Sequence, residues 1–157
     1  MKWYVGKGLE EYLAQLGNLG QGAEGYIKKA VYPAAGLVAK EIVKNIDGIP
    51  ERKSWKDTTG ITETQRKGLK EGFGIAKFEN ERGYVHVKLG FDGYNEQKTD
   101  RWPEGQPNAM IARSIEGGTS WSPKIRFVAP AVKSTTSQAE DIMRVSIDQS
   151  IRRIMKV

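Results

Sequence analysis

Cysteine is absent from this chain of 157 residues, and histidine occurs once, as His86. The missing cysteine excludes disulfides, thiolate nucleophiles and cysteine-ligated metals, and it fits synthesis in the cytosol. No apolar stretch approaches the roughly 20 residues that a membrane-spanning helix needs. Because the chain has one histidine and no nucleophile-elbow motif, it offers little for acid–base or nucleophilic catalysis. We therefore expect a protein that is not an enzyme.

Metal and cofactor sites have equally little support in the sequence. Without cysteine a zinc site would need more than one histidine, so we expect His86, on the polar face of a predicted strand, to be structural or solvated. The glycines within residues 17–22 lack the Gly-Lys-Ser/Thr ending of a phosphate loop. The acidic residues within 92–100 lack the glycine that an EF-hand needs at its bend. We expect neither a metal nor a cofactor.

The net charge of +6 permits two interpretations. One is a soluble protein with an uneven surface, and the other is a nucleic-acid partner. The richest basic stretch, residues 51–70, also carries three acidic residues, and no single arm or helix face collects the charge. The pattern favours the first interpretation. The length suits one domain with its own core, which we expect to cover residues 1–157.

Apolar residues in the first third of the chain recur at helical spacing. We expect a short edge strand at residues 3–5 and then a helix over residues 9–16 that ends at Gly17. A longer amphipathic helix is predicted from about Ala23 to Ile46. Pro33 lies inside this pattern, so it either kinks the helix or opens a second one. The predicted buried stripe of the long helix consists of Ile27, Val31, Ala35, Val38, Ile42 and Ile46.

Capping signals predict two further helices. Thr62 suits the N-cap of a short helix that runs to about Glu71. Ser137 and Glu140 have the spacing of a capping box, so the last helix is expected to begin near Ser137. Its predicted buried face consists of Ala139, Met143, Ile147 and Ile154.

Four strands are predicted between these helices. Residues 73–79 and 84–91 form a hairpin through a loop at residues 80–83, and the second strand alternates apolar and polar residues. A third strand is expected at about 109–116 and a fourth at 125–128. The loops at about 47–62 and 92–108 are long. The expected fold is α+β, an antiparallel sheet with the long helix and the C-terminal helix packed on one face.

Three tryptophans lie in predicted loops beside basic residues: Trp55, Trp102 and Trp121. Each can fold back over the core as an anchor for its loop. Aromatic residues are also enriched at protein–protein interfaces, and next to basic residues they can stack nucleic-acid bases. The sequence leaves these three interpretations open.

The segment from Ile111 to Ala131 carries the most specific pattern in the chain. It reads Ile-Glu-Gly-Gly-Thr-Ser at 115–120, then Pro123, then Phe-Val-x-Pro-Ala at 127–131. This pattern resembles the tail-completion or head–tail joining family of tailed bacteriophages, defective prophages and phage-tail-like bacteriocins. Members combine an amphipathic helix, a hairpin, a strand ending in such a turn and a C-terminal helix, and the likeness covers residues 9–156. Four residues are expected to shape the turns: Gly117, Gly118, Pro123 and Pro130.

The resemblance implies a structural protein without catalytic residues. Members form a ring, expected to be hexameric, at the head-proximal end of the tail, as a tail-completion, tail-terminator or head–tail joining protein. The implied partners are tail tube or sheath proteins and head connector or neck proteins, with no membrane contact. The protein would be made in the bacterial host cytoplasm and reside in the virion or in a phage-tail-like particle.

Within such a ring the two long loops are the expected means of subunit contact. The expected subunit or ring interface consists of Trp55, Tyr94, Arg101, Trp102 and Trp121. Basic residues are expected to meet an acidic neighbouring ring or to line a channel with weak contact to DNA, namely Arg52, Lys53 and Lys56. The alternative function is a non-specific nucleic-acid-binding module that uses these basic-aromatic loops.

Overall fold

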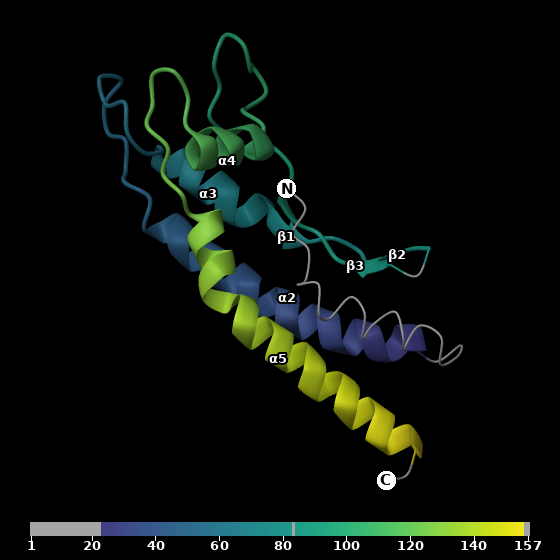
Figure 1. Cartoon of the computed structure of the whole chain (residues 1–157). Coiled ribbons are helices and arrows are strands. Elements are labelled where there is room, and N and C mark those ends of the chain that lie inside the picture. The colour runs from purple at the N-terminus through teal and green to yellow at the C-terminus, as the bar shows by residue number, and fades with distance from the viewer. Residues whose placement is uncertain (1–22, 83, 156–157) are drawn as a thin grey trace. The chain divides into compact units, whose positions relative to one another are not determined.

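The computed structural model of the protein describes residues 23–82 and 84–155 (Figure 1). The predicted strand at residues 3–5, the predicted helix at residues 9–16 and the predicted turn residue Gly83 lie outside the described residues. The helices are α2 (Ala23–Asp47), α3 (Glu63–Gly72), α4 (Asn108–Gly117) and α5 (Val128–Met155). The strands are β1 (Phe73–Ile75), β2 (Glu79–Glu81), β3 (Tyr84–His86) and β4 (Leu89–Phe91). The fold is therefore α+β, as predicted.

The chain groups into two compact units that are each built from separate segments. Unit 1 contains residues up to Ala39, residues 75–89 and residues from Ser134 onward. Unit 2 contains residues 40–74 and 90–133. The chain of α2 and that of α5 therefore each pass through both units. No helix within the described ranges is long and apolar enough to cross a membrane.

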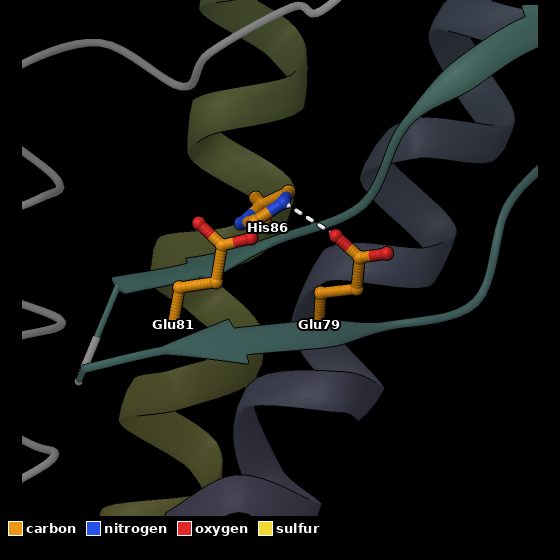
Figure 2. A group of neighbouring side chains, drawn as sticks. All are labelled: Glu79, Glu81 and His86. Atoms are coloured by element: carbon orange, nitrogen blue, oxygen red, sulfur yellow. Dashed lines mark hydrogen bonds and ion pairs between the residues drawn. The ribbon is translucent and has the colours of Figure 1, made fainter.

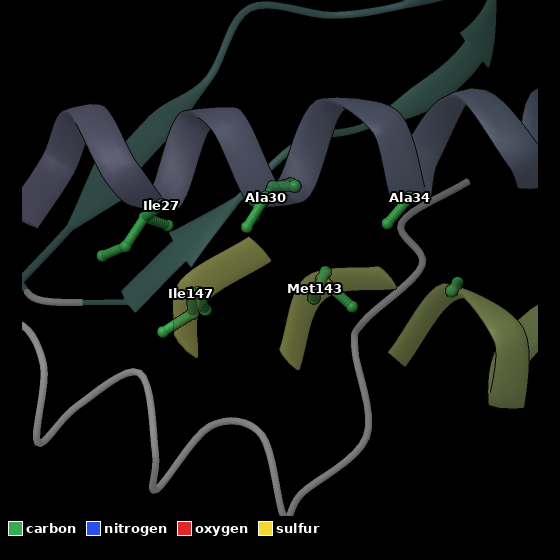
Figure 3. Close-up of a cluster of buried hydrophobic side chains, with 7 residues drawn as sticks. Ile27, Ala30, Ala34, Met143 and Ile147 are labelled. Atoms are coloured by element: carbon green, nitrogen blue, oxygen red, sulfur yellow. The ribbon is translucent and has the colours of Figure 1, made fainter. Parts of the chain in front are cut away.

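Unit 1 is held together by α2 and α5. Figure 3 shows Ile27, Ala30 and Ala34 of α2 opposite Met143 and Ile147 of α5. The two alanines let the helix backbones approach closely, and the larger side chains fill the space between them. The predicted stripe of α2 is confirmed, since five of its six residues are buried and Val38 is half-buried. Pro33 lies within α2, which continues past it.

The hairpin of unit 1 packs against this helix pair. β2 and β3 are antiparallel, with Glu79 opposite His86 and Glu81 opposite Tyr84. The chain turns at Arg82, which adopts a left-handed φ of 54°. The apolar face of the predicted alternation is confirmed, because Val85 and Val87 pack against the helical core together with Phe78.

The predicted four-stranded sheet was wrong. The described residues form two separate two-stranded pairs, β1 with β4 and β2 with β3. Each predicted hairpin strand divides into two strands of three residues, and the Ala76 N–H donates to the Lys88 carbonyl between the two pairs. The predicted third and fourth strands do not exist in the described chain, because residues 108–117 are helical and residues 122–126 are irregular.

Helix α4 replaces the predicted strand at 109–116. Its buried residues are Asn108, Ile111, Ala112 and Ile115. The spacing of three and four between them is that of one helix face, and a strand would have buried alternate residues instead. The run of apolar residues was therefore assigned the wrong period. Packing against α3 in unit 2 buries that face.

Helix α5 begins at Val128, nine residues before the predicted start at Ser137. The predicted capping box lies inside the helix and caps nothing. The observed cap comes from α4, since the Glu116 carboxylate accepts hydrogen bonds from the backbone N–H groups of Phe127, Val128 and Ala129, at 2.8, 2.9 and 3.0 Å. Pro130 lies in the first turn of α5, where the missing N–H is tolerated. Sequence rules for helix caps consider only residues next to the helix start, so they do not identify a cap eleven residues away.

Helix α3 follows its prediction closely. The Thr62 hydroxyl accepts from the Gln65 N–H at 3.2 Å, and the Gln65 side-chain oxygen accepts from the Thr62 N–H at 3.0 Å. This reciprocal pair is a capping box, which satisfies two backbone donors at the helix start. The Arg66 guanidinium then donates to the carbonyl of Ile46 in the last turn of α2 and to that of Ile49 just after the helix. Arg66 thereby ties α3 to the last turn of α2 within unit 2.

Candidate functional site

All the predicted interface residues belong to unit 2. They lie on the three loops at residues 48–62, 92–107 and 118–127, and Figure 1 shows these loops extending from the same side of α3 and α4. The sequence predicted the first two as loops and placed a strand in the third. The fold thus brings the tryptophan-bearing segments to one unit of the molecule.

The loop at 48–62 has an internally bonded backbone. The Asp57 carboxylate accepts hydrogen bonds from the N–H groups of Lys53 and Ser54 at 3.0 and 2.9 Å. Glu51 and Ile61 form an isolated bridge that closes the base of the loop. Trp55, at the tip, is 87% exposed, so it does not fold back as an anchor.

The three predicted basic docking residues differ in their surroundings. Arg52 is half-buried, and its guanidinium donates to the Gly60 carbonyl at 3.1 Å, so it holds its own loop together. Lys53 is exposed and lies 3.8 Å from the Glu51 carboxylate. The Lys56 ammonium lies 5.5 Å from the ring centre of Trp55, within cation–π range. Of the three, Lys53 and Lys56 present charge at the loop surface.

The loop at 92–107 carries the other predicted anchors. Tyr94 is 66% exposed, although its backbone forms an isolated bridge to Pro107. Trp102 is half-buried, and its N–H and carbonyl exchange two hydrogen bonds with Thr99. The Arg101 guanidinium lies 5.7 Å from the Trp102 ring centre. The loop therefore holds its side chains on a bonded backbone.

The loop at 118–127 places Trp121 73% exposed at a tight turn. Thr119 and Ser122 bond each other across the turn, through backbone and side chain. Gly118 has a φ of +75°, and a Cβ there would lie 2.9 Å from the Lys124 nitrogen. A glycine is therefore required at position 118, whereas Gly117 simply ends α4 and has no described neighbour within 4 Å of a Cβ. Pro123 is exposed in the segment that leads to α5.

A buried polar cluster beneath these loops was missed by the sequence reasoning. Asn108 donates to the Asp92 carbonyl at 2.9 Å, and Gln65 donates to the Gln106 side-chain oxygen at 2.7 Å. Asn95 is buried, and its side-chain oxygen accepts from the Gln97 N–H. Such amides replace backbone partners that a loop cannot supply, so they fix where the 92–107 loop begins and ends.

A second group of side chains was also missed, on the hairpin of unit 1. Figure 2 shows the His86 imidazole between the carboxylates of Glu79 and Glu81. One donor atom from each of the three residues lies within 4.8 Å of the other two. Pairing places this group, because Glu79 and Glu81 share a strand face and His86 is opposite Glu79.

The electrostatics of this hairpin group are set by Lys88. The Lys88 ammonium donates to Glu79 Oε2 at 2.8 Å, and His86 Nε2 lies 2.9 Å from the same oxygen. The hydrogen bond and charge of Lys88 hold the pKa of Glu79 below its usual range, and His86 adds a smaller effect. The His86 side chain is only 10% exposed, and its buried Nδ1 has no hydrogen-bond partner within residues 23–82 and 84–155.

The signal that could have found this group is the spacing across the turn. Glu79 and Glu81 are two residues apart, and His86 follows a hairpin loop that the sequence did predict. The predicted strand ended at Glu79, and Glu81 was predicted to lie in the loop. The two carboxylates were therefore not placed on one strand face. Pairing Glu79 with His86 required the observed register.

In comparisons with known proteins, no family model, no curated protein and no solved structure matches this chain.

Proposed function

We propose that this protein is a structural subunit of a ring at the head-proximal end of a phage tail or phage-tail-like particle. Its role would be tail completion, tail termination or head–tail joining. The observation that carries the proposal is the exposure of three large aromatic side chains on the loops of unit 2, Trp55, Tyr94 and Trp121. The sequence pattern at 115–131 resembles that of tail-completion proteins, and this resemblance is the reason for proposing a tail assembly in particular.

Exposed tryptophans on bonded loops suit a protein interface. Burial of apolar area stabilises association by about 25 cal/mol per Å², and tryptophan, tyrosine and arginine dominate measured interface energetics. The hydrogen bonds of Asp57 and the Thr119–Ser122 turn already order the backbones that carry Trp55 and Trp121. Binding then costs less conformational entropy than it would for loops without such hydrogen bonds.

A ring needs a contact between two different surfaces of neighbouring subunits. Such head-to-tail contacts close when the rotation between subunits divides a full turn. Loops that extend from one side of unit 2 suit one half of this contact, with a different surface of the next subunit as the other half. Lys53 and Lys56 would add attraction for an acidic neighbour and would make assembly sensitive to salt.

The test measures assembly of the purified protein by native mass spectrometry and negative-stain electron microscopy, alone and with tail tubes. We expect rings, and we expect Trp55→Ser with Trp121→Ser to weaken ring formation about tenfold or more. The matched control is Val145→Ser, because Val145 is 54% exposed but lies on α5 in unit 1. A protein that stays monomeric at all concentrations and never binds tube ends would overturn the proposal.

The same preparation tests the nucleic-acid alternative. A non-specific binding module would bind single-stranded DNA at low salt and lose affinity steeply as salt rises. It would also lose affinity on Trp55→Ser, through the lost base stacking. The Arg52 guanidinium is engaged with the Gly60 carbonyl, so the loop has one basic side chain fewer for phosphate contacts, which favours the assembly role.

A further inference from the structure

We propose that Glu79, Glu81 and His86 form a binding site for a divalent transition-metal ion of the zinc class, which bridges β2 and β3. This site goes beyond the proposed assembly function and does not depend on it. Three kinds of observation carry the proposal: the donor set, its spacing and the unpaired nitrogen of His86.

The donor set matches zinc chemistry. Imidazole and carboxylate are both established zinc ligands, with bonds of roughly 2.0–2.2 Å. An imidazole among the donors favours zinc, cobalt or nickel over magnesium or calcium, which prefer oxygen ligands alone. Three protein ligands leave at least one position for water. The absence of cysteine therefore does not exclude zinc, because carboxylates take the place of further histidines.

The spacing of the donors is close to what an ion requires. Bonds of about 2.1 Å in a tetrahedral arrangement place ligand atoms about 3.4 Å apart. The donors of Glu79, Glu81 and His86 already lie within 4.8 Å of one another. Glu81 is exposed, so its side chain has room to rotate and bring its carboxylate toward the other two donors. The hairpin therefore holds the ligands in nearly the required positions.

The imidazole has unused bonding capacity at the site. Its side chain is nine-tenths buried, and its buried Nδ1 has no hydrogen-bond partner among the described residues. Figure 2 shows the ring between the two carboxylates, with the bonded nitrogen toward Glu79 and the other nitrogen on the side of Glu81. A buried polar atom without a partner costs free energy, so a ligand that recruits the ring is favoured. Coordination by one ring nitrogen leaves the other to hydrogen-bond a carboxylate, which orients the ring.

Lys88 is the natural competitor for the ion. Its ammonium lies 2.8 Å from Glu79 Oε2, where it keeps that carboxylate ionised but also repels a second cation. The Glu79 carboxylate has a second oxygen that an ion can use, and the Lys88 side chain is half-buried rather than enclosed. Lys88 and a metal ion would compete for the Glu79 carboxylate. Removal of the lysine charge should therefore strengthen metal binding, although it weakens the ion pairs of Glu79 in the metal-free protein.

The test uses the tag-free full chain after treatment with a chelator. Cobalt(II) is titrated in and followed by its visible absorption, and zinc binding is followed by calorimetry and by the thermal midpoint. We expect one ion per chain and a higher thermal midpoint with zinc. The ion would link the two strands of a hairpin that has little stability by itself. Glu81→Gln should weaken binding at least tenfold, and Lys88→Met should tighten it.

The matched control is Glu24→Gln, which removes an exposed carboxylate that pairs with Lys28 on α2. It should leave metal affinity unchanged. His86→Asn provides a second ligand variant, and circular dichroism of each variant without metal shows whether it has folded. Failure of stoichiometric cobalt to give visible bands would overturn the site, as would equal affinities for the wild type and Glu81→Gln. Weaker binding by Lys88→Met would also overturn it.

Discussion

At the scale of single residues, Glu116 has the most concentrated structural role in the chain. Its carboxylate accepts hydrogen bonds from three backbone N–H groups at the start of α5. The first N–H groups of a helix have no partner within the helix itself. The negative charge of Glu116 also lies at the positive end of a helix dipole. The residue belongs to the 115–120 pattern that carries the phage resemblance. That pattern is therefore explained in part by helix capping.

Replacement of Glu116 should destabilise the protein more than its position near a loop suggests. We expect Glu116→Ala to lower the free energy of unfolding by about 2–3 kcal/mol, because charge-assisted hydrogen bonds are lost and buried donors remain. Glu116→Gln should lose less, since one oxygen can still accept. Urea titration measures both, with Glu104→Ala, an exposed carboxylate, as a control expected within about 0.5 kcal/mol. Equal stability of Glu116→Ala and Glu104→Ala would contradict this role.

At the scale of elements, the contact of α3 with α4 decides the architecture of unit 2. Gly68 lies on α3 where a Cβ would meet the Asn95 side chain at 2.3 Å and the Asn108 side-chain oxygen at 2.7 Å. The glycine thus lets the helix approach the buried amides that anchor the 92–107 loop. Helix propensity alone would favour alanine at this position.

Two glycine-to-alanine substitutions separate packing from propensity. Gly68→Ala should destabilise the protein by about 1–3 kcal/mol, because the buried amides must shift. Gly36→Ala, inside α2, should stabilise it by about 0.5–1 kcal/mol, because a Cβ there would meet no described atom within 4 Å apart from the nearby backbone of α2 itself. Thermal and urea unfolding measure both changes. A stabilised Gly68→Ala would show that the approach of α3 to Asn95 and Asn108 is looser than the structure indicates.

Whole elements were predictable from the sequence where their signal is local. Helix α2 has a stripe of six apolar residues, and α3 has both residues of its capping box close together. Helix α4 and the start of α5 were wrong, because a short apolar run fits either period and because Glu116 caps from another element. The hairpin was predicted, but its division into two strand pairs depends on packing.

At the scale of the whole molecule, α2 and α5 each contribute residues to both compact units. The core of unit 1 contains Met143 and Ile147, and three tryptophans lie in unit 2. Each of these helices has one part in unit 1 and the other part in unit 2. Loss of helical structure in one unit therefore destabilises the part of the same helix that belongs to the other unit. The units should therefore lose their structure together.

This coupling predicts one unfolding transition. Ile147→Ala in the core of unit 1 should lower the free energy of unfolding by about 2–5 kcal/mol. The same shift should appear in the tryptophan fluorescence of a Trp3→Phe background, whose remaining tryptophans, Trp55, Trp102 and Trp121, all lie in unit 2. It should also appear in far-ultraviolet circular dichroism. Exposed Glu24→Ala in unit 1 is the control. A fluorescence midpoint that stays unchanged in Ile147→Ala would mean that the units unfold separately.

The sequence by itself determined the helical stripes, the cap of α3, the hairpin and the two long loops, because each depends on residues within a few positions of one another. It also carried the resemblance on which the assembly proposal depends. Only the tertiary structure decided that residues 108–117 are a helix, that Glu116 caps α5, and that Glu79, Glu81 and His86 share one face. Contacts and strand register between separate segments decide these features, and a local pattern that fits two periods, as at residues 108–117, does not decide them by itself.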